Sequence, residues 1–440
     1  MTGDAPAGIP GPRTLRPLVG VLAAMAVSLT GTRVSGIALP WFVLVTTGSA
    51  TQTGLVAFCE MAPYVVVKAL TGPLVDRVGP RTVSWTTDLV SGAAVAVVPL
   101  LHVLDLLSFP LLLALVAVVG AARGPGDLCK EVMVPEAAER ARVPLERAAG
   151  FAGVVERLAS TLGPAVGGVL VALLGPLAGL VVNAVCFGLG SAVIALTLPR
   201  GAGRAADGAS DEGGGQEAGY WRRFGEGFAF LRREPMLRVI VGMLGITNLL
   251  DAAISGVLIP VWAKESGAGP AAIGLMSGTM GAAAVVGSLI AAALAHRLSR
   301  RAVFFAGFAL AGAPRFVVLA LDAPLWGILP VFAVSGFGAG FLNPVLAAVL
   351  FERVPRPMLG RAQALGDALA WAGIPLGGLV AGAAVSLAGL TPVLLAFGAA
   401  YFLTTHLAGL RPEWRAMDRA RRAVAPEPGV STGISPGGPD

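Results

Sequence analysis

Charged residues, cysteine and histidine are all scarce in this 440-residue sequence. Asp, Glu, Lys and Arg together make up 13% of the residues, against roughly 25% in an average soluble domain. With 55% hydrophobic residues and a mean hydropathy of +0.78, the composition excludes an ordinary water-soluble enzyme and excludes a disordered chain. We therefore expect a membrane protein that crosses the bilayer several times.

The scarcity of particular side chains also excludes several kinds of site. The three cysteines lie far apart within apolar stretches, and the three histidines are equally scattered. Their spacing indicates neither a disulfide framework nor a metal site. No lysine follows a glycine, so the sequence has no phosphate-binding loop for ATP. We expect no cofactor and no enzymatic activity.

Apolar residues are present in blocks of about 20, the length that an α-helix needs to cross the hydrocarbon core of a bilayer. Gly (60) and Pro (32) are abundant within these blocks, as spanning helices that pack against neighbours allow. The predicted fold class is an all-α membrane protein with twelve transmembrane helices. The predicted helices cover residues 17–45, 49–73, 82–104, 108–130, 147–174, 176–198, 237–263, 270–295, 302–321, 324–349, 361–388 and 391–410.

The positions of the 32 Lys and Arg residues predict the orientation. Cytoplasmic loops carry the excess of positive charge, and almost all of these residues fall on alternate loops if the N-terminus lies inside. Lys264 lies on the opposite side, and further basic residues lie within the helices, namely Arg33, Lys68, Arg123, Arg157 and Arg315. We expect a multi-pass protein of the cell membrane with both termini in the cytoplasm. Because the charges are dispersed, the pI of 9.8 does not indicate a nucleic-acid partner.

An internal repeat divides the chain into two halves. Gly54-Leu55 aligns with Gly274-Leu275, and the loop at 76–81 aligns with the loop at 296–301. This predicts two pseudo-symmetric six-helix bundles, residues 17–198 and 237–410, as in transporters that move two parallel repeats about a central site. The other predicted segments are a cytoplasmic tail at 1–16, a cytoplasmic linker at 199–236 with an amphipathic interfacial helix at 220–236, and a disordered cytoplasmic tail at 411–440.

The loop after the second helix resembles the signature of the major facilitator superfamily. Residues 72–81 read Gly-Pro-Leu-Val-Asp-Arg-Val-Gly-Pro-Arg, against the pattern Gly-x-Leu-x-Asp-Arg-x-Gly-Arg-Arg/Lys, so Pro80 replaces a basic residue. From the residues alone, Gly72 permits close helix contact, and the arginines hold the loop at an anionic membrane surface. The resemblance implies a latch that joins the two halves in the outward-open state, formed by Gly72, Asp76, Arg77, Gly79 and Arg81.

Two further motifs favour export. The segments Ala38-Leu39-Pro40 and Thr87-Asp88-Leu89 are similar to the drug-efflux branch of this superfamily, which includes macrolide and enterobactin exporters. In the fifth helix, five residues resemble the antiporter motif Gly-x8-Gly-x3-Gly-Pro-x2-Gly-Gly, namely Gly150, Gly163, Pro164, Gly167 and Gly168. The alternative interpretation of these residues is close helix packing in a Gly-rich chain.

Polar side chains within the helices are candidates for a substrate cavity, because a charge at the bilayer centre costs roughly 3 kcal/mol. In the resembling fold, helices 1, 4, 7 and 10 line the cavity, and here they carry Arg33, Arg123, Asp127, Asn248, Asp251 and Asn343. We expect Arg33 and Asp251 to face each other across the cavity. Asp251 is the first candidate for proton coupling and Glu60 the second. Arg123 and Asp127, at i,i+4 spacing, are alternatively a structural pair.

The sequence therefore predicts a secondary active transporter that exports a lipophilic or amphipathic small molecule, such as an antibiotic, in exchange for protons. We expect it to act as a monomer surrounded by membrane lipids. The alternatives are a transporter of another solute, such as a siderophore, a metabolite or an uptake substrate, and a membrane receptor that does not transport its ligand.

Overall fold

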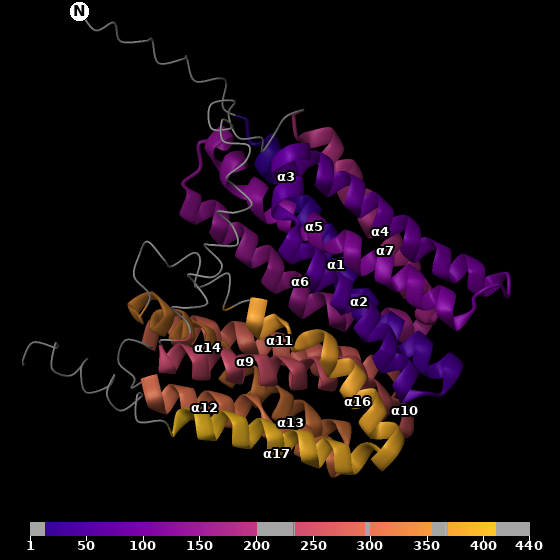
Figure 1. Ribbon diagram of the computed structural model, residues 1–440, viewed down its shortest axis with the longest axis vertical. Helices are drawn as coiled ribbons and strands as arrows, with labels where there is room; N and C mark the ends of the chain where they lie inside the picture. The colour runs from indigo at the N-terminus through magenta and orange to yellow at the C-terminus, as the bar shows by residue number, and fades with distance from the viewer. Residues whose placement is uncertain are drawn as a thin grey trace, which may run out of the picture.

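The structure is a computed structural model that describes residues 14–199, 232, 234–294, 300–353, 366 and 368–410, and it is helical throughout these ranges (Figure 1). In the described residues, twelve helical segments are long and apolar enough to cross a membrane, which confirms the predicted number. The first six spans and one short connecting helix are α1 (Arg16–Thr47), α2 (Ala50–Leu70), α3 (Gly72–Val78), α4 (Pro80–Val103), α5 (Phe109–Ala141), α6 (Leu145–Leu174) and α7 (Pro176–Thr197).

The second half of the chain forms the other six spans, some of them from more than one element. The seventh span joins α9 (Pro235–Ala253), the π-helix η1 (Ile254–Leu258) and α10 (Ile259–Glu265), and the ninth joins α12 (Arg300–Ala311) and α13 (Ala313–Ala320). The eleventh span, Ala368–Ala388, includes α16 (Ile374–Ala388). The remaining spans are α11 (Gly269–Leu294), α14 (Leu325–Arg353) and α17 (Leu390–Gly409).

Local sequence explains the sharp turns between antiparallel spans. The turn from α1 to α2 uses Gly48 at φ 70°, a left-handed conformation that favours glycine, and Ser49 as the N-cap of α2. The Ser49 hydroxyl oxygen accepts a hydrogen bond from the Gln52 backbone N–H at 3.2 Å. Such caps satisfy polar groups at helix ends, where the apolar surroundings offer no other partner.

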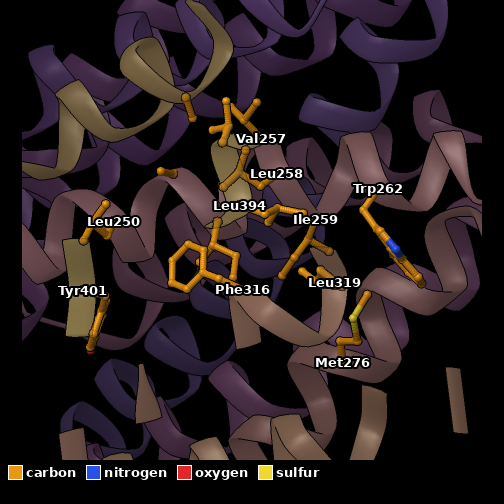
Figure 2. Packing of buried hydrophobic residues seen from close by; sticks show 14 of the residues in the cluster. Leu250, Val257, Leu258, Ile259, Trp262, Met276, Phe316, Leu319, Leu394 and Tyr401 are labelled. Carbon is orange, nitrogen blue, oxygen red and sulfur yellow. The ribbon is translucent and has the colours of Figure 1, made fainter. Parts of the chain in front are cut away.

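Helices α1 to α7 pack on one another, and α9 to α17 pack on one another, so the two halves of the chain lie one beside the other (Figure 1). In the second half, a large buried apolar cluster joins side chains from α9 to α17. Figure 2 shows Phe316 and Leu394 near its centre, with Tyr401 to one side and Trp262 and Met276 to the other. Ile37, Leu44 and Ala50 of the first half also belong to this cluster, whereas two further apolar clusters lie wholly within the first half.

The two halves meet mainly along two pairs of helices, α2 with α16 and α6 with α11 (Figure 1). Glycines allow these close approaches. A Cβ added at Gly168 of α6 would lie 2.7 Å from the Gly274 Cα of α11, and a Cβ at Gly54 of α2 would clash with the Gly378 backbone of α16. Because Gly54 and Gly274 occupy equivalent positions in the repeat, the two seams are equivalent contacts related by the internal symmetry.

Polar bonds join the halves at the end of the molecule where α1 ends and α2 begins, called here the α1–α2 end. The Lys264 ammonium donates to the Leu44 carbonyl at 2.8 Å, and the hydroxyl groups of Thr51 and Ser386 lie 2.6 Å apart. The opposite end, called here the α3 end, carries α3 and the start of α1. The halves are thus bonded together at the α1–α2 end.

Several predicted segments lie wholly or largely outside the described residues. They are the N-terminal tail at 1–16 apart from residues 14–16, the linker and interfacial helix at 199–236 apart from residues 199, 232 and 234–236, the repeat loop at 296–301 apart from residues 300 and 301, and the C-terminal tail at 411–440. Asp76 and Asn343 lie in α3 and α14, but their side chains also lie outside what the structure describes.

Candidate substrate and coupling site

A cluster of charged side chains lies inside the first half. Arg123 of α5 is buried, and its Nη1 donates to Glu60 Oε1 of α2 at 2.7 Å. Its Nε lies 3.8 Å from Asp127 Oδ2, so the i,i+4 pair that the sequence suggested is formed. The Tyr64 hydroxyl donates to Asp127 Oδ2 at 3.4 Å, and the Arg123 guanidinium lies 4.5 Å from the Tyr64 ring centroid. Arg123 and Asp127 therefore each have several partners.

The cluster continues toward α4 and α1 through a buried lysine. The Lys130 ammonium lies 2.8 Å from Asp88 Oδ1 and 3.9 Å from Asp127 Oδ1. Asp88 also accepts a hydrogen bond from the Ser28 hydroxyl of α1 at 3.3 Å. Burying an unpaired charge in a membrane-spanning bundle would be very unfavourable, so these bonds stabilise the packing of α1, α4 and α5.

Arg33 is an exposed residue near the middle of α1. The charges that act on it belong to the first half: Glu156 and Asp127 attract its guanidinium, and Arg123 repels it. Gly163 of α6 makes room for it, because a Cβ at Gly163 would lie 2.6 Å from the Arg33 Cβ. The first half thus brings together three of the predicted cavity residues, Arg33, Arg123 and Asp127.

In the second half, Asp251 of α9 is paired with Arg315 of α13. The Arg315 Nη2 donates to Asp251 Oδ1 at 2.6 Å. The Arg315 side chain is only 5% exposed, whereas that of Asp251 is 41% exposed. The other described neighbours of the guanidinium are the Met280 sulfur at 3.8 Å and the rings of Phe316 and Tyr401 at about 6 Å. A buried guanidinium in these weakly polar surroundings depends on one partly accessible carboxylate.

Asp251 is ion-paired with Arg315 of its own half, and the expectation that it faces Arg33 across the cavity stays a prediction. The repeat aligns Arg33 with Ala253 rather than with Asp251, and two residues correspond to a rotation of about 200° around an α-helix. Ala253 is fully buried, and Asp251 instead reaches the neighbouring helix α13. The repeat therefore relates Arg33 and Asp251 in approximate depth only, and it does not fix which way each side chain points.

The seventh span changes from α-helix to π-helix three residues after Asp251. Residues Ile254–Leu258 form the π-helix η1, and α10 follows with Pro260 in its first turn. The Ser255 hydroxyl donates to the Asp251 backbone carbonyl at 2.7 Å. π-Helical turns within α-helices are rare and are frequent at functional sites. Asp251 thus lies at an irregular point of a span that also contacts α1 and α2 of the other half.

Asn248, one turn before Asp251, has a bond within its own half. Its Nδ2 donates to the Ala370 carbonyl at 3.0 Å. The helical segment that includes Ala370 is interrupted by a turn at residues 372–373, before α16 begins. Asn248 therefore satisfies a backbone carbonyl next to a helix break, and its place as a substrate-cavity residue stays a prediction.

The superfamily signature forms α3 and the start of α4. Gly79 joins them at φ 92°, which favours glycine, and Pro80 occupies the first turn of α4, where no N–H is needed. Arg81 donates to the carbonyls of Leu198 at 2.9 Å and Ala195 at 2.6 Å, so in this structure it caps α7 within the first half.

Other residues of the signature have open surroundings. Among the described residues, no heavy atom lies within 4 Å of a Cβ added at Gly72, so none of them makes the close helix contact expected there. Arg77 is exposed. These residues lie at the α3 end, whereas the described polar bonds between the halves lie at the α1–α2 end. The signature residues therefore do not take part in those bonds. The latch between halves stays a prediction for another conformation.

The antiporter-like motif gives α6 two contact faces. Gly163 and Gly167 face α1, and a Cβ at Gly167 would lie 2.9 Å from the Val34 Cα. Gly168 faces α11 of the other half, and the Pro164 carbonyl lies 2.6 Å from where a Cβ at Gly274 would be. Gly150 has no neighbour within 4 Å of an added Cβ. Four of the five motif residues therefore build the contacts of α6, and Gly150 does not.

Three residues of these charged groups were not predicted from the sequence, namely Arg315, Lys130 and Tyr64. The sequence shows Arg315 as a charge within a helix but does not reveal its partner, and it does not connect Lys130 or Tyr64 with the charged cluster. A charge inside an apolar helix was the available signal. Within the described residues, no group of His, Cys, Asp or Glu is arranged to hold a metal ion.

Twelve apolar spans, two packed halves and carboxylate–arginine pairs inside the spans define a polytopic membrane transporter. The chain belongs to the transmembrane secretion effector family of the major facilitator superfamily, and this family matches residues 18–437. The predicted family and fold class are confirmed.

Known proteins resemble the chain over nearly its whole length. It is 32% identical over 413 residues to the multidrug efflux pump Tap of Mycobacterium tuberculosis, covering 93% of this chain and 96% of the relative. It is 30% identical over 410 residues to Tap of Mycolicibacterium fortuitum, covering 92% and 98%. A variant of the nucleoside transporter NupG has the same fold, with a TM-score of 0.72 and 14% identity over 92% of this chain and all of that chain.

Proposed function

We propose that this protein exports lipophilic or amphipathic small molecules across the cell membrane in exchange for protons, by alternating access of the two halves. The multidrug efflux pumps to which it is 30–32% identical over most of its length support export and the substrate class. The proposed orientation places both termini and the α3 end in the cytoplasm, as the basic loops indicate. The protein is proposed to act as a monomer, because one chain supplies both halves.

The observation that carries the proposal is the ion pair between Asp251 and Arg315 inside the spanning helices. Protonation of Asp251 removes the charge that compensates the buried Arg315 guanidinium. Such a state is unfavourable in low-dielectric surroundings, so the pair must separate or rearrange. Asp251 lies three residues before the start of η1, in a span that contacts the other half. We therefore expect this rearrangement to change the contacts between the halves.

Two features give Asp251 priority over Glu60 as the proposed coupling site. The Asp251 side chain is 41% exposed, so a proton reaches it more readily than it reaches the largely buried Glu60. Arg123, the partner of Glu60, also has Asp127 nearby, so protonation of Glu60 leaves its arginine partly compensated. Glu60 remains the second proposed site.

The proposed substrate cavity comprises the polar groups of the first, fourth, seventh and tenth spans, namely Arg33, Arg123, Asp127, Asn248, Asp251 and Asn343. With the proposed orientation, the bonds at the α1–α2 end close the outer side in this structure. Gly168 and Gly274 lie at the same end, where they let α6 and α11 approach each other closely. The proposed role of the antiporter-like motif is to close that side through this contact.

The experiment is transport by purified protein in liposomes that contain a pH-sensitive dye. A proton gradient is imposed, and macrolides, other lipophilic antibiotics and siderophores are added one at a time. We expect some lipophilic antibiotics to dissipate the gradient with the native protein and not with D251N. The matched control is D105N, because Asp105 is an exposed loop residue at φ 55°, a conformation that Asn also tolerates.

Each outcome has a defined meaning. Proton movement that survives D251N and is lost in E60Q would move the coupling site to Glu60. Substrate accumulation that runs inward under an acidic exterior would replace export by uptake. A response to siderophores alone would change the substrate class, and ligand binding with no movement of any compound would indicate a receptor.

A further inference from the structure

One ammonium group of the chain occupies a site made from both halves. The Lys68 Nζ lies 5.8 Å from the ring centroid of Tyr64 and 5.4 Å from that of Trp371, and 3.3 Å from Glu131 Oε1. Tyr64 and Lys68 lie on α2, and Glu131 lies on α5. Trp371 belongs to the eleventh span, in the other half. Two aromatic faces and a carboxylate therefore surround one cation.

This arrangement has the chemistry that recognises an organic cation. Aromatic faces attract a cation within about 6 Å of the ring centroid through their quadrupole, and a neighbouring carboxylate adds charge attraction. The presence of the Lys68 ammonium shows that the geometry accommodates a positively charged nitrogen. The site is accessible on its Trp371 and Glu131 side, since Trp371 is 39% exposed and the Glu131 side chain 57% exposed, whereas Tyr64 forms its buried wall.

The Lys68 ammonium is more easily displaced than the second cation on Tyr64. Arg123 also lies over that ring, but it is buried and held by Glu60 at 2.7 Å. Lys68 sits in the last turn of α2 on a flexible four-carbon chain, and its pair with Glu131 is the partly exposed kind that contributes little to stability. A lysine chain of this kind can turn toward water at the membrane surface when another cation takes its place.

We propose that Tyr64, Trp371 and Glu131 form a binding site for the cationic group of an amphipathic organic amine, and that Lys68 is a tethered competitor for this site. The inference rests on the proposed function and specifies it. The site lies toward the α3 end, between the halves, where a molecule from the proposed cytoplasmic side or its lipid leaflet reaches the protein first. Lys68 lowers the affinity for such cations and keeps the site filled when no substrate is present.

The test is equilibrium binding of ethidium, a planar organic cation, to the purified full-length protein, with the fluorescent anion fluorescein as the comparison probe. Replacing Lys68 by Met removes the competitor, so we expect K68M to bind ethidium about five-fold more tightly. W371L and E131Q are each expected to bind it about five-fold more weakly. K68R keeps the cation and is the matched control, with an affinity within about two-fold of the native value.

A double variant separates this proposal from a general effect of charge. If the vacated aromatic site binds the probe, the gain in K68M disappears in the double variant K68M/W371L. If the removal of one positive charge merely raises attraction for cations, the gain persists in the double variant, and the proposal is overturned. Unchanged or weaker ethidium binding by K68M would also overturn it, as would an equal gain for fluorescein.

The binding measurement uses no gradient, so it is independent of transport. A protein that binds ethidium as expected but moves no compound in liposomes would retain this site while losing the proposed export function. Conversely, proton-coupled export of antibiotics with no effect of the Lys68 and Trp371 variants on ethidium affinity would retain the function and refute the site.

Discussion

The two halves of this transporter place charges inside the membrane in different ways. In the first half, Arg123 and Lys130 each lie near two carboxylates, and both share Asp127. In the described part of the second half, Arg315 has one carboxylate partner, Asp251. From this comparison we predict that loss of one charge is compensated in the first half and not in the second. The predicted role of the first half is a rigid scaffold, and that of the second is a switch.

The two halves differ in their buried charges, but they are alike in the glycines through which they contact each other. Gly54 approaches Gly378, and the equivalent Gly274 approaches Gly168. Close backbone approach needs residues without side chains at matching positions, so both copies of the repeat keep glycine there. The halves thus agree where they contact each other and differ in the charges that they enclose.

The largest effect on stability is expected from D251N. The amide cannot compensate the Arg315 guanidinium, which stays buried, so we expect the free energy of unfolding to fall by about 3 kcal/mol. Thermal unfolding in detergent measures this loss. The double variant D251L/R315M removes both charges and is expected to recover most of it. A D251N protein as stable as the native one would show that Arg315 has another counter-ion.

For G168A we expect a smaller loss of stability than for D251N, together with a loss of transport. The added Cβ would lie 2.7 Å from the Gly274 Cα and 2.8 Å from the Pro270 carbonyl oxygen, so backbone must shift. We expect a loss of about 2 kcal/mol in stability and at least a ten-fold loss of transport, because the seam of α6 and α11 no longer closes. G150A is the matched control, since a Cβ there meets nothing within 4 Å. Equal transport by both variants would remove the seam from the mechanism.

The Glu60 variant tests compensation in the first half directly. In E60Q, Arg123 keeps Asp127 and the Tyr64 ring, and the Gln oxygen still accepts a hydrogen bond. We therefore expect a stability loss of about 1 kcal/mol, well below that of D251N. A thermal-unfolding series that ranks E60Q as equal to or worse than D251N would contradict the proposed difference between the halves.

The smallest effect on stability is expected from E131Q, because the pair with Lys68 is partly exposed. Pairs of this kind contribute at most about 1 kcal/mol, so the unfolding temperature should be almost unchanged. Ethidium affinity should fall nevertheless, as the proposed cation site requires. A large loss of stability in E131Q would contradict this prediction and show that the pair supports the fold.

Some of the site was predictable because it depends on neighbours along one helix or on composition. The pair of Arg123 with Asp127 follows from i,i+4 spacing, and Gly168 follows from its motif. The pair of Asp251 with Arg315 was not predictable, because 64 residues separate the partners and the rotation of each helix about its axis decides which side chains meet. The same holds for Asn248, whose amide bonds to the carbonyl of Ala370 in a different span.

The twelve apolar spans, the internal repeat and the superfamily signature could be predicted from the amino-acid sequence, because hydrophobic length and local motifs depend on consecutive residues. Three features could be found only in the folded chain: Asp251 reaches Arg315, a Cβ added at Gly72 meets no described atom within 4 Å, and Lys68 lies near Trp371. The physical reason is that membrane helices choose their neighbours and rotations by packing of small residues and by mutual compensation of buried charges. Both depend on groups brought together from distant parts of the chain.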